Sequence, residues 1–187
     1  MTRSQCERFL AAVHVGVLSV AGAEAGQAPL TVPIWYSYRP GGLITVLTGR
    51  DSAKARRIRA AGRFTLCAQQ EEPPCRYVSV GGPVVAIEDH VDPDERAALA
   101  HRYLPPATAA AYLVATAEQL TADVTVRMRP ERWLSADFSV VTGQIAALER
   151  SMPRRPGPPG SDPRRPAPGR AAPGSGRGPE HPASGRG

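Results

Sequence analysis

The sequence predicts a mainly β domain over residues 1 to about 150, built as a small, partly closed antiparallel barrel with flanking helices. Two observations lead to this fold class. Short runs of alternating or β-branched residues are joined by connections of hairpin length, which favours antiparallel pairing over a parallel, helix-linked sheet. Six such strands in a chain of this length fit a small barrel whose ends are covered by helices.

The first half of the domain should begin with a short amphipathic helix. Ser4 and Glu7 stand at capping-box spacing ahead of an apolar run. Alternating and β-branched residues then predict three strands, over residues 14–20, 31–38 and 43–48. Pro33 should lie at an edge or a bulge, because proline cannot donate a hydrogen bond to a β-ladder.

A second helix should follow, capped by Asp51 or Ser52 and ended by Gly62. Alternating residues then predict two more strands, over residues 63–69 and 76–88. A bulge or corner in the second of these strands fits Gly81-Gly82-Pro83.

Two helices and one strand should complete the domain. Asp92-Pro93-Asp94-Glu95 combines a cap, a first-turn proline and acidic residues at the positive end of the helix dipole, and so predicts a helix to about Tyr103. An alanine-rich helix over residues 107–117 follows, and alternating residues over 122–128 predict the last strand.

Residues 151–187 differ in composition from the domain, and we expect them to form a disordered tail rich in Pro, Gly and Arg. From residue 153 onward there are ten prolines and eight glycines in 35 residues, with too few apolar side chains to offset the entropy of ordering. Seven arginines and two acidic residues give this segment 7 − 2 = +5 of the chain's net charge of +6. The domain is therefore nearly neutral, and we expect at most weak nucleic-acid contacts, made by the basic tail.

Cysteine and histidine usage predicts a reduced compartment and no metal site. The three cysteines form no CxxC pair, and the four histidines lack metal-ligand spacing. The N-terminus has no basic region followed by a long apolar run, and no apolar stretch is long enough to span a membrane. We therefore expect a soluble, cytoplasmic protein.

Lys54 is the only lysine among the 23 basic residues of the chain, the others all being arginine. It either serves a purpose that needs a compact ammonium, or it is the remaining lysine of a codon-biased sequence on a helix surface. Its position in the first turn of the predicted helix favours a function, because free backbone N–H groups there attract anions. We take the segment from Thr48 to Arg57 as a candidate anion site. It lacks the Walker pattern, so nucleotide triphosphate hydrolysis has no support.

A series of motifs resembles a known family. The chain contains Pro33-Ile34-Trp35-Tyr36, then Thr48 to Arg56, then Pro73 to Val78, and later Arg127 to Trp133. In this order and spacing, over about residues 5 to 140, they resemble the pyridoxamine 5′-phosphate oxidase-like split-barrel superfamily, and most of all its actinobacterial flavin- or deazaflavin-dependent oxidoreductases. The resemblance implies an FMN-binding type of split barrel. It also implies a homodimer with the cofactor at the interface.

The resemblance further implies where a cofactor binds. The strand that contains Pro33 would line the ring, and the segment from Thr48 to Arg56 would hold the phosphate of FMN or of coenzyme F-420. The implied cofactor-binding residues are Pro33, Trp35, Tyr36, Thr48, Gly49, Arg50, Ser52, Lys54, Arg56, Arg57 and Arg76. Trp35 and Tyr36 are strand neighbours that face opposite ways, so one of them is expected to belong to the core.

The implied function is an F-420- or FMN-dependent oxidoreductase that transfers a hydride between the cofactor and a small organic substrate. The sequence shows no arrangement of catalytic side chains, which fits chemistry carried by a cofactor. The additional arginines favour F-420, because its oligoglutamate tail is anionic. The alternatives are an FMN-binding pyridoxamine 5′-phosphate oxidase-like protein and a cofactor-binding protein without turnover.

Overall fold

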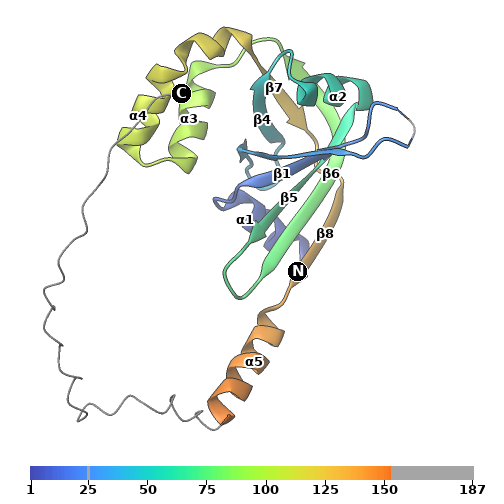
Figure 1. Ribbon diagram of the computed structural model, residues 1–187, viewed down its shortest axis with the longest axis vertical. Coiled ribbons are helices and arrows are strands. Elements are labelled where there is room, and N and C mark those ends of the chain that lie inside the picture. The colour runs from blue at the N-terminus through green and yellow to red at the C-terminus, as the bar shows by residue number, and fades with distance from the viewer. Residues whose placement is uncertain (25, 153–187) are drawn as a thin grey trace, which may run out of the picture. The chain divides into compact units, whose positions relative to one another are not determined.

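The computed structural model describes residues 1–24 and 26–152, so the predicted tail from residue 153 onward lies outside the described residues. Figure 1 shows the elements. The helices are α1 (Arg3–Ala11), α2 (Ala53–Ala61), α3 (Pro93–Tyr103), α4 (Pro106–Ala115) and α5 (Ser139–Ser151), with a 3₁₀ turn over Ala117–Ala122. The strands are β1 (Gly16–Val20), β2 (Leu30–Ile34), β3 (Tyr36–Ser37), β4 (Ile44–Gly49), β5 (Arg63–Gln70), β6 (Arg76–Glu88), β7 (Asp123–Met128) and β8 (Arg132–Asp137).

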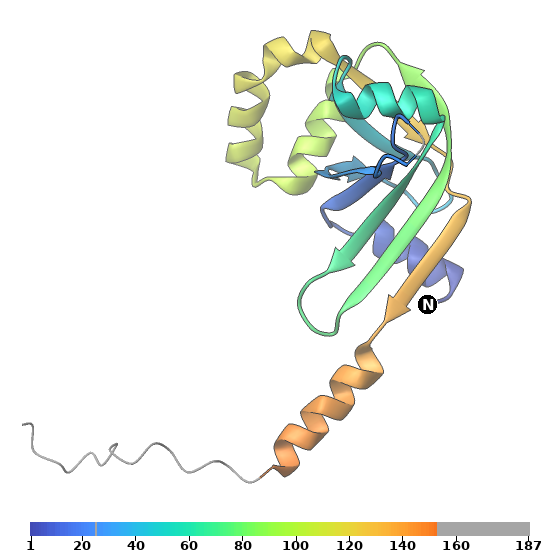
Figure 2. The same cartoon turned by 45° about the vertical axis from the view of Figure 1, so that its right-hand side comes forward.

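The strands form one curled antiparallel sheet, in the order β2-β1-β5-β6-β7-β4-β3, with β8 added alongside β6. The predicted antiparallel barrel is confirmed. The two ends of this order, β2 and β3, are consecutive in the chain and separated only by Trp35. The sheet therefore curls until its ends meet at Trp35, which gives the half-barrel of Figures 1 and 2.

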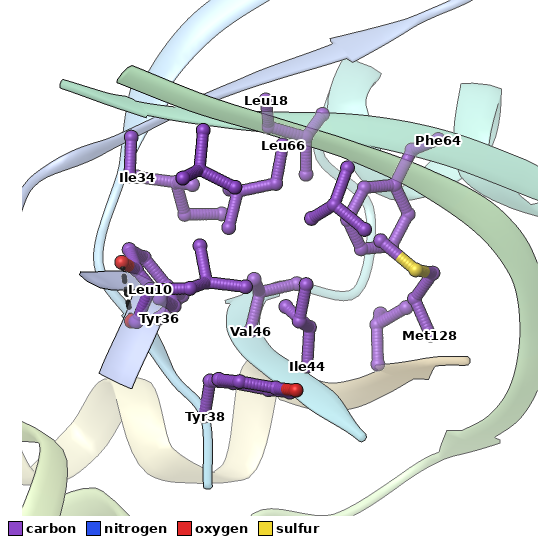
Figure 3. Packing of buried hydrophobic residues seen from close by; sticks show 14 of the residues in the cluster. Leu10, Leu18, Ile34, Tyr36, Tyr38, Ile44, Val46, Phe64, Leu66 and Met128 are labelled. Atoms are coloured by element: carbon purple, nitrogen blue, oxygen red, sulfur yellow. Dashed lines mark hydrogen bonds between the residues drawn. The ribbon is translucent and has the colours of Figure 1, made fainter. Parts of the chain in front are cut away.

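The barrel encloses a core to which α1 contributes. Leu10 of α1 has no exposed surface, and it packs among the inward-facing side chains of the strands. Figure 3 shows Leu10 beside Tyr36, whose hydroxyl donates a hydrogen bond to the Leu10 carbonyl oxygen at 2.8 Å. The cluster in Figure 3 includes Leu10, Leu18, Ile34, Tyr36, Tyr38, Ile44, Val46, Phe64, Leu66 and Met128.

The helix caps agree with the sequence for α2 and α3 and differ for α1. Ser52 caps α2, and Gly62 ends it in the left-handed conformation with a φ of 62°. The first helix begins earlier than predicted, because Thr2 and Gln5 form the capping box in place of Ser4 and Glu7. Both pairs have suitable side chains, and the earlier start leaves Glu7 free to pair with Arg3 at 2.9 Å.

β6 connects the two halves of the sheet. Its first part pairs with β5 and β8, and its last residues pair with β7. The register shift lies between Val84 and Ala86, just after the predicted position, because Gly82 and Pro83 still pair with β5. Gly82 is nevertheless essential, since a Cβ there would lie 1.8 Å from the carbonyl oxygen of Arg129.

Three features differ from the sequence-based expectation. The single strand predicted over residues 31–38 is interrupted at Trp35, whereas Pro33 stays paired with Val17 in the edge strand β2. β8 was not expected, because its residues do not alternate between polar and apolar. The last helix, α5, was not expected either, and none of its side chains is buried.

α3 and α4 form a helical pair beside the barrel (Figures 1 and 2). Two side chains of α3 attach it to the barrel. The Tyr103 hydroxyl accepts a hydrogen bond from the Tyr36 backbone N–H at 3.1 Å, and Arg102 donates to the Ala11 carbonyl at 2.9 Å. Within the described part of the chain, no helix is long and apolar enough to cross a membrane.

Candidate functional site

The junction between β4 and α2 is built by two hydroxyl groups. The Thr48 and Ser52 hydroxyl oxygens lie 3.1 Å apart in a hydrogen bond, and Ser52 accepts the Ala55 backbone N–H at 3.0 Å. Both hydroxyls thus hold the helix start in place. The backbone N–H groups of Ala53 and Lys54 have no hydrogen-bond partner among the described residues. They are the free donors that an anion would use at this helix start.

Lys54 extends from this helix start into a pocket of about 240 Å³. Its ammonium group makes no hydrogen bond or ion pair with the residues that the structure describes. Burial lowers the pKa of Lys54, and the carboxylate of Asp123 partly opposes this effect. A cation that is partly removed from water and lacks a direct partner favours an incoming anion. The pocket is lined by Pro33, Ile34, Trp35, Leu47, Lys54, Arg96, Leu99, Ala100, Tyr112 and Asp123.

Arg96 is a second cation of this pocket, and it was not predicted. Only 7% of Arg96 is exposed. Its guanidinium donates to Asp123 at 3.0 Å and to the carbonyl and hydroxyl oxygens of Thr116 at 2.8 and 2.7 Å. Lys54 and Arg96 together face the single carboxylate of Asp123, so the formal charge at this end of the pocket is +1. In the sequence, Arg96 resembled any arginine on a helix surface, because its partners come from segments 20 and 27 residues away.

Trp35 forms the aromatic wall of the pocket. Its ring stacks on Tyr103 of α3, with centroids 5.0 Å apart and planes 5° from parallel. The ring of Tyr112 of α4 lies 5.6 Å away, at 55°. One face of the indole is thus occupied by Tyr103. Trp35 therefore shapes the pocket wall through its remaining surface, and α3 and α4 hold it in place.

A larger groove of about 800 Å³ adjoins this pocket, and the two share Leu47 and Leu99. The groove runs between the outer side of β3 and β4 and the helix α3. At its far end Arg127 donates hydrogen bonds to Glu88 and Glu95, each at 2.9 Å. The hydrogen bond from Arg127 holds the pKa of Glu88 below its ordinary value.

Two of the predicted site residues, Tyr36 and Arg76, lie away from the Lys54 pocket. Tyr36 has no exposed surface, and burial raises the pKa of its hydroxyl. It is the core member of the Trp35–Tyr36 pair, because Trp35 sits at the break between β2 and β3 and faces the pocket. Arg76 lies at the opposite end of β6 from Glu88 and lines a different pocket.

The remaining predicted arginines lie on α2 or just before it, and none of them lines the Lys54 pocket. Arg50 donates to the carbonyl oxygen of Asp89, on the segment after β6. Arg56 and Arg57 line a separate pocket of about 520 Å³ against the loop between β1 and β2. Gly49 pairs with Asp123 in the sheet, which brings the β4 backbone next to the pocket carboxylate. Of the predicted set, the structure thus brings Pro33, Trp35 and Lys54 together, with Thr48, Gly49 and Ser52 supporting them.

The described residues contain no group of three or more His, Cys, Asp or Glu side chains that could hold a metal ion. The site instead offers two cations, Lys54 and Arg96, one carboxylate, Asp123, and the free backbone N–H donors of Ala53 and Lys54. This donor set fits an anionic organic ligand.

Several solved structures are similar in fold to this chain. The conserved hypothetical protein Rv2991 from Mycobacterium tuberculosis is 23% identical, with a TM-score of 0.59 over 76% of this chain and 88% of that one. An F420 reductase is 21% identical, with a TM-score of 0.54 over 68% of this chain and 94% of that one. The protein Atu2129 from Agrobacterium tumefaciens, of unknown function, is 16% identical, with a TM-score of 0.53 over 73% of this chain and 56% of that one.

The fold is a split β-barrel. This confirms the predicted resemblance to the pyridoxamine 5′-phosphate oxidase-like proteins at the level of the fold. No protein-family model matches the chain, and no curated protein matches its sequence. At these identities the likeness concerns the fold alone, and a fold does not by itself define a function.

Proposed function

We propose that this split barrel binds a phosphate-bearing flavin or deazaflavin and acts as an oxidoreductase on a small organic substrate. The observation that carries the proposal is Lys54, a partly buried ammonium without a direct partner, in a pocket that adjoins a larger groove. The adjoining groove of about 800 Å³ has the size typical of pockets for cofactors and other small molecules. The fold and the site thus support the same class of ligand.

The residues of the pocket fit a cofactor phosphate in three ways. Lys54 supplies a point charge, and the N–H groups of Ala53 and Lys54 supply donors at the positive end of α2. Arg96 keeps Asp123 engaged, so that the carboxylate does not neutralise Lys54 by itself. Pro33 and Trp35 form the adjacent apolar wall, against which the organic part of the ligand would lie.

The bound cofactor would supply the hydride chemistry, and the protein supplies binding and orientation. Leu47 and Leu99 lie where the pocket and groove meet, and give that junction an apolar lining. Such a lining excludes water around a bound ring and strengthens the electrostatic contacts at the Lys54 end. No titrating side chain of this chain is needed for the transfer itself.

Within this class we propose coenzyme F-420 over FMN, and a homodimer with the cofactor at its interface. Arg56 and Arg57 lie on the same helix as Lys54, one turn or less away, and their pocket opens beside the helix. An oligoglutamate tail bound next to Lys54 would find these two guanidinium groups within reach, whereas FMN would leave them unused. An F420 reductase with the same fold is consistent with this choice.

Titration with FMN and, separately, with F-420 tests the proposal. Trp35 lines the pocket, so a Trp133→Phe variant leaves Trp35 as the only tryptophan reporter of binding. We expect quenching of Trp35 fluorescence and a shifted visible spectrum of the cofactor, with tighter binding of F-420. Failure to bind either cofactor would refute the proposal. Tight binding without reduction of enone, quinone or imine acceptors would refute the oxidoreductase activity and indicate a binding protein without turnover.

A further inference from the structure

A second concave site lies at the opposite end of β6 from the Lys54 pocket. It has a volume of about 470 Å³ and forms where α1, the residue His14, and the hairpin between β5 and β6 meet. Arg8 and Arg76 both line it, together with Gln70 and Asp137. The site shares none of its lining residues with the groove or with the Lys54 pocket. It comes nearest to the groove at the end of α1, where Ala11 lines the groove and Ala12 lines this site.

The two guanidinium groups of this site have few protein partners. Arg76 donates one hydrogen bond, from Nη2 to Gln70 at 2.7 Å, and its Nε is buried without a partner. Arg8 forms no ion pair or side-chain hydrogen bond within the described ranges. An arginine side chain carries five N–H donors in a planar fork, so most of the donors of these two residues are unused.

The only carboxylate lining the site is already engaged. Asp137 accepts the backbone N–H of Ser139 at 2.9 Å and its hydroxyl at 2.5 Å, and these bonds hold the pKa of Asp137 below its ordinary value. Asp137 forms no ion pair with Arg8 or Arg76 in the described residues. Two guanidinium groups and one carboxylate therefore line this concave surface, so the formal charge of these three side chains is +1 and one cation is left without a matching anion.

The floor of the site is aromatic. The rings of Phe9 and His14 stack with their centroids 4.3 Å apart and their planes 18° from parallel, and the guanidinium of Arg76 lies 5.6 Å from the Phe9 ring. Burial lowers the pKa of His14, and the charges of Arg102 and Arg76 lower it further. A flat apolar floor with cations at its rim suits an organic anion.

We propose that this site binds a small organic oxyanion, a carboxylate or a phosphate monoester, which Arg8 and Arg76 hold above the Phe9–His14 stack. The planar forks of arginine match both kinds of oxyanion. The proposal does not depend on the proposed cofactor site, since the two use different residues.

Calorimetric titration of the full chain with succinate and with inorganic phosphate, at constant ionic strength, tests this site. Amide shifts in NMR spectra of this 19.8 kDa protein locate the binding. We expect shifts around His14, and an increase of about tenfold in the dissociation constant for Arg76→Gln, the usual scale for one charge-assisted contact. Arg63→Gln, an equal change of charge at an exposed arginine on β5, should leave the affinity within about twofold. A preference for succinate identifies a carboxylate ligand, and a preference for phosphate identifies a phosphate monoester.

Absence of binding of both probes, equal losses in Arg76→Gln and Arg63→Gln, or shifts confined to the surroundings of Lys54 would each refute the proposal. Arg8→Gln provides a second variant, because Arg8 is exposed and its replacement leaves the core intact. Lys54→Met removes the cofactor phosphate contact alone, so a failure at one site is distinguishable from a failure at the other.

Discussion

Replacing Lys54 by methionine should have opposite effects on ligand binding and on the stability of the free protein. The ammonium is partly buried without a direct partner, and burial lowers its pKa. Methionine has a similar length and no charge, so it removes the unfavourable burial of a cation and, at the same time, the attraction for a phosphate. A lysine that was only a solvent-exposed residue on a helix surface would show neither effect.

The size of the binding effect follows from the lost contact. A hydrogen bond to a charged group contributes about 1.5–3 kcal/mol, which corresponds to a loss of about 10- to 150-fold in affinity. The remaining donors, the N–H groups of Ala53 and Lys54, do not depend on the side chain and stay in place. We therefore expect Lys54→Met to weaken binding of the preferred cofactor by this factor without abolishing it.

The stability effect has a defined sign with pH. Because the folded protein lowers the pKa of Lys54, the unfolded chain binds more protons between the folded and the unfolded pKa values, and the contribution of Lys54 to stability rises with pH in that window. The pH slope should be smaller in Lys54→Met, and the variant should be at least as stable as the parent at neutral pH. Urea unfolding between neutral and alkaline pH measures both quantities. Arg63→Met serves as the control with the same change of charge. Cofactor binding by Lys54→Met as tight as that of the parent, or unfolding of this variant at clearly lower urea concentration, would contradict this role of Lys54.

Arg96→Met should destabilise the fold by about 3 kcal/mol, measured by urea unfolding, because it leaves the carboxylate of Asp123 largely enclosed without its partner; an effect below about 1 kcal/mol would show that water solvates this carboxylate. Gly82→Ala should lower stability by about 3 kcal/mol or more, since its Cβ would collide with a backbone carbonyl oxygen, whereas Gly143→Ala, with open space around it, should not destabilise the protein. Glu88 has a lowered pKa, so its ion pair contributes stability above the ordinary glutamate pKa of about 4.3 that is lost as the pH falls through the lower folded value. Glu88→Gln should therefore unfold with a weaker dependence on acid pH, and an unchanged dependence would contradict this origin of the shift.

The parts of the fold that depend on residues close together in the sequence could be predicted well. The cap at Ser52, the left-handed end at Gly62 and the proline-led start of α3 each depend on side chains within a few positions of the helix end. β8 and α5 were not predicted, because no such local signal marks them. Neither has a regular local pattern of polar and apolar residues, since β8 is defined by its pairing with β6 and α5 buries no side chain.

The sequence by itself determined where an anion could bind, because the only lysine stands in the first turn of a helix and both facts are local. The tertiary structure decided which residues join it. Arg96 and Asp123 are 27 positions apart and meet only because α3 packs beside β7, and Tyr103 reaches Trp35 across an even longer stretch of chain. The same packing placed Tyr36 in the core and put Arg76 at the far end of β6, in a pocket of its own. Such contacts depend on how the sheet curls and closes at Trp35, which no local pattern of residues encodes.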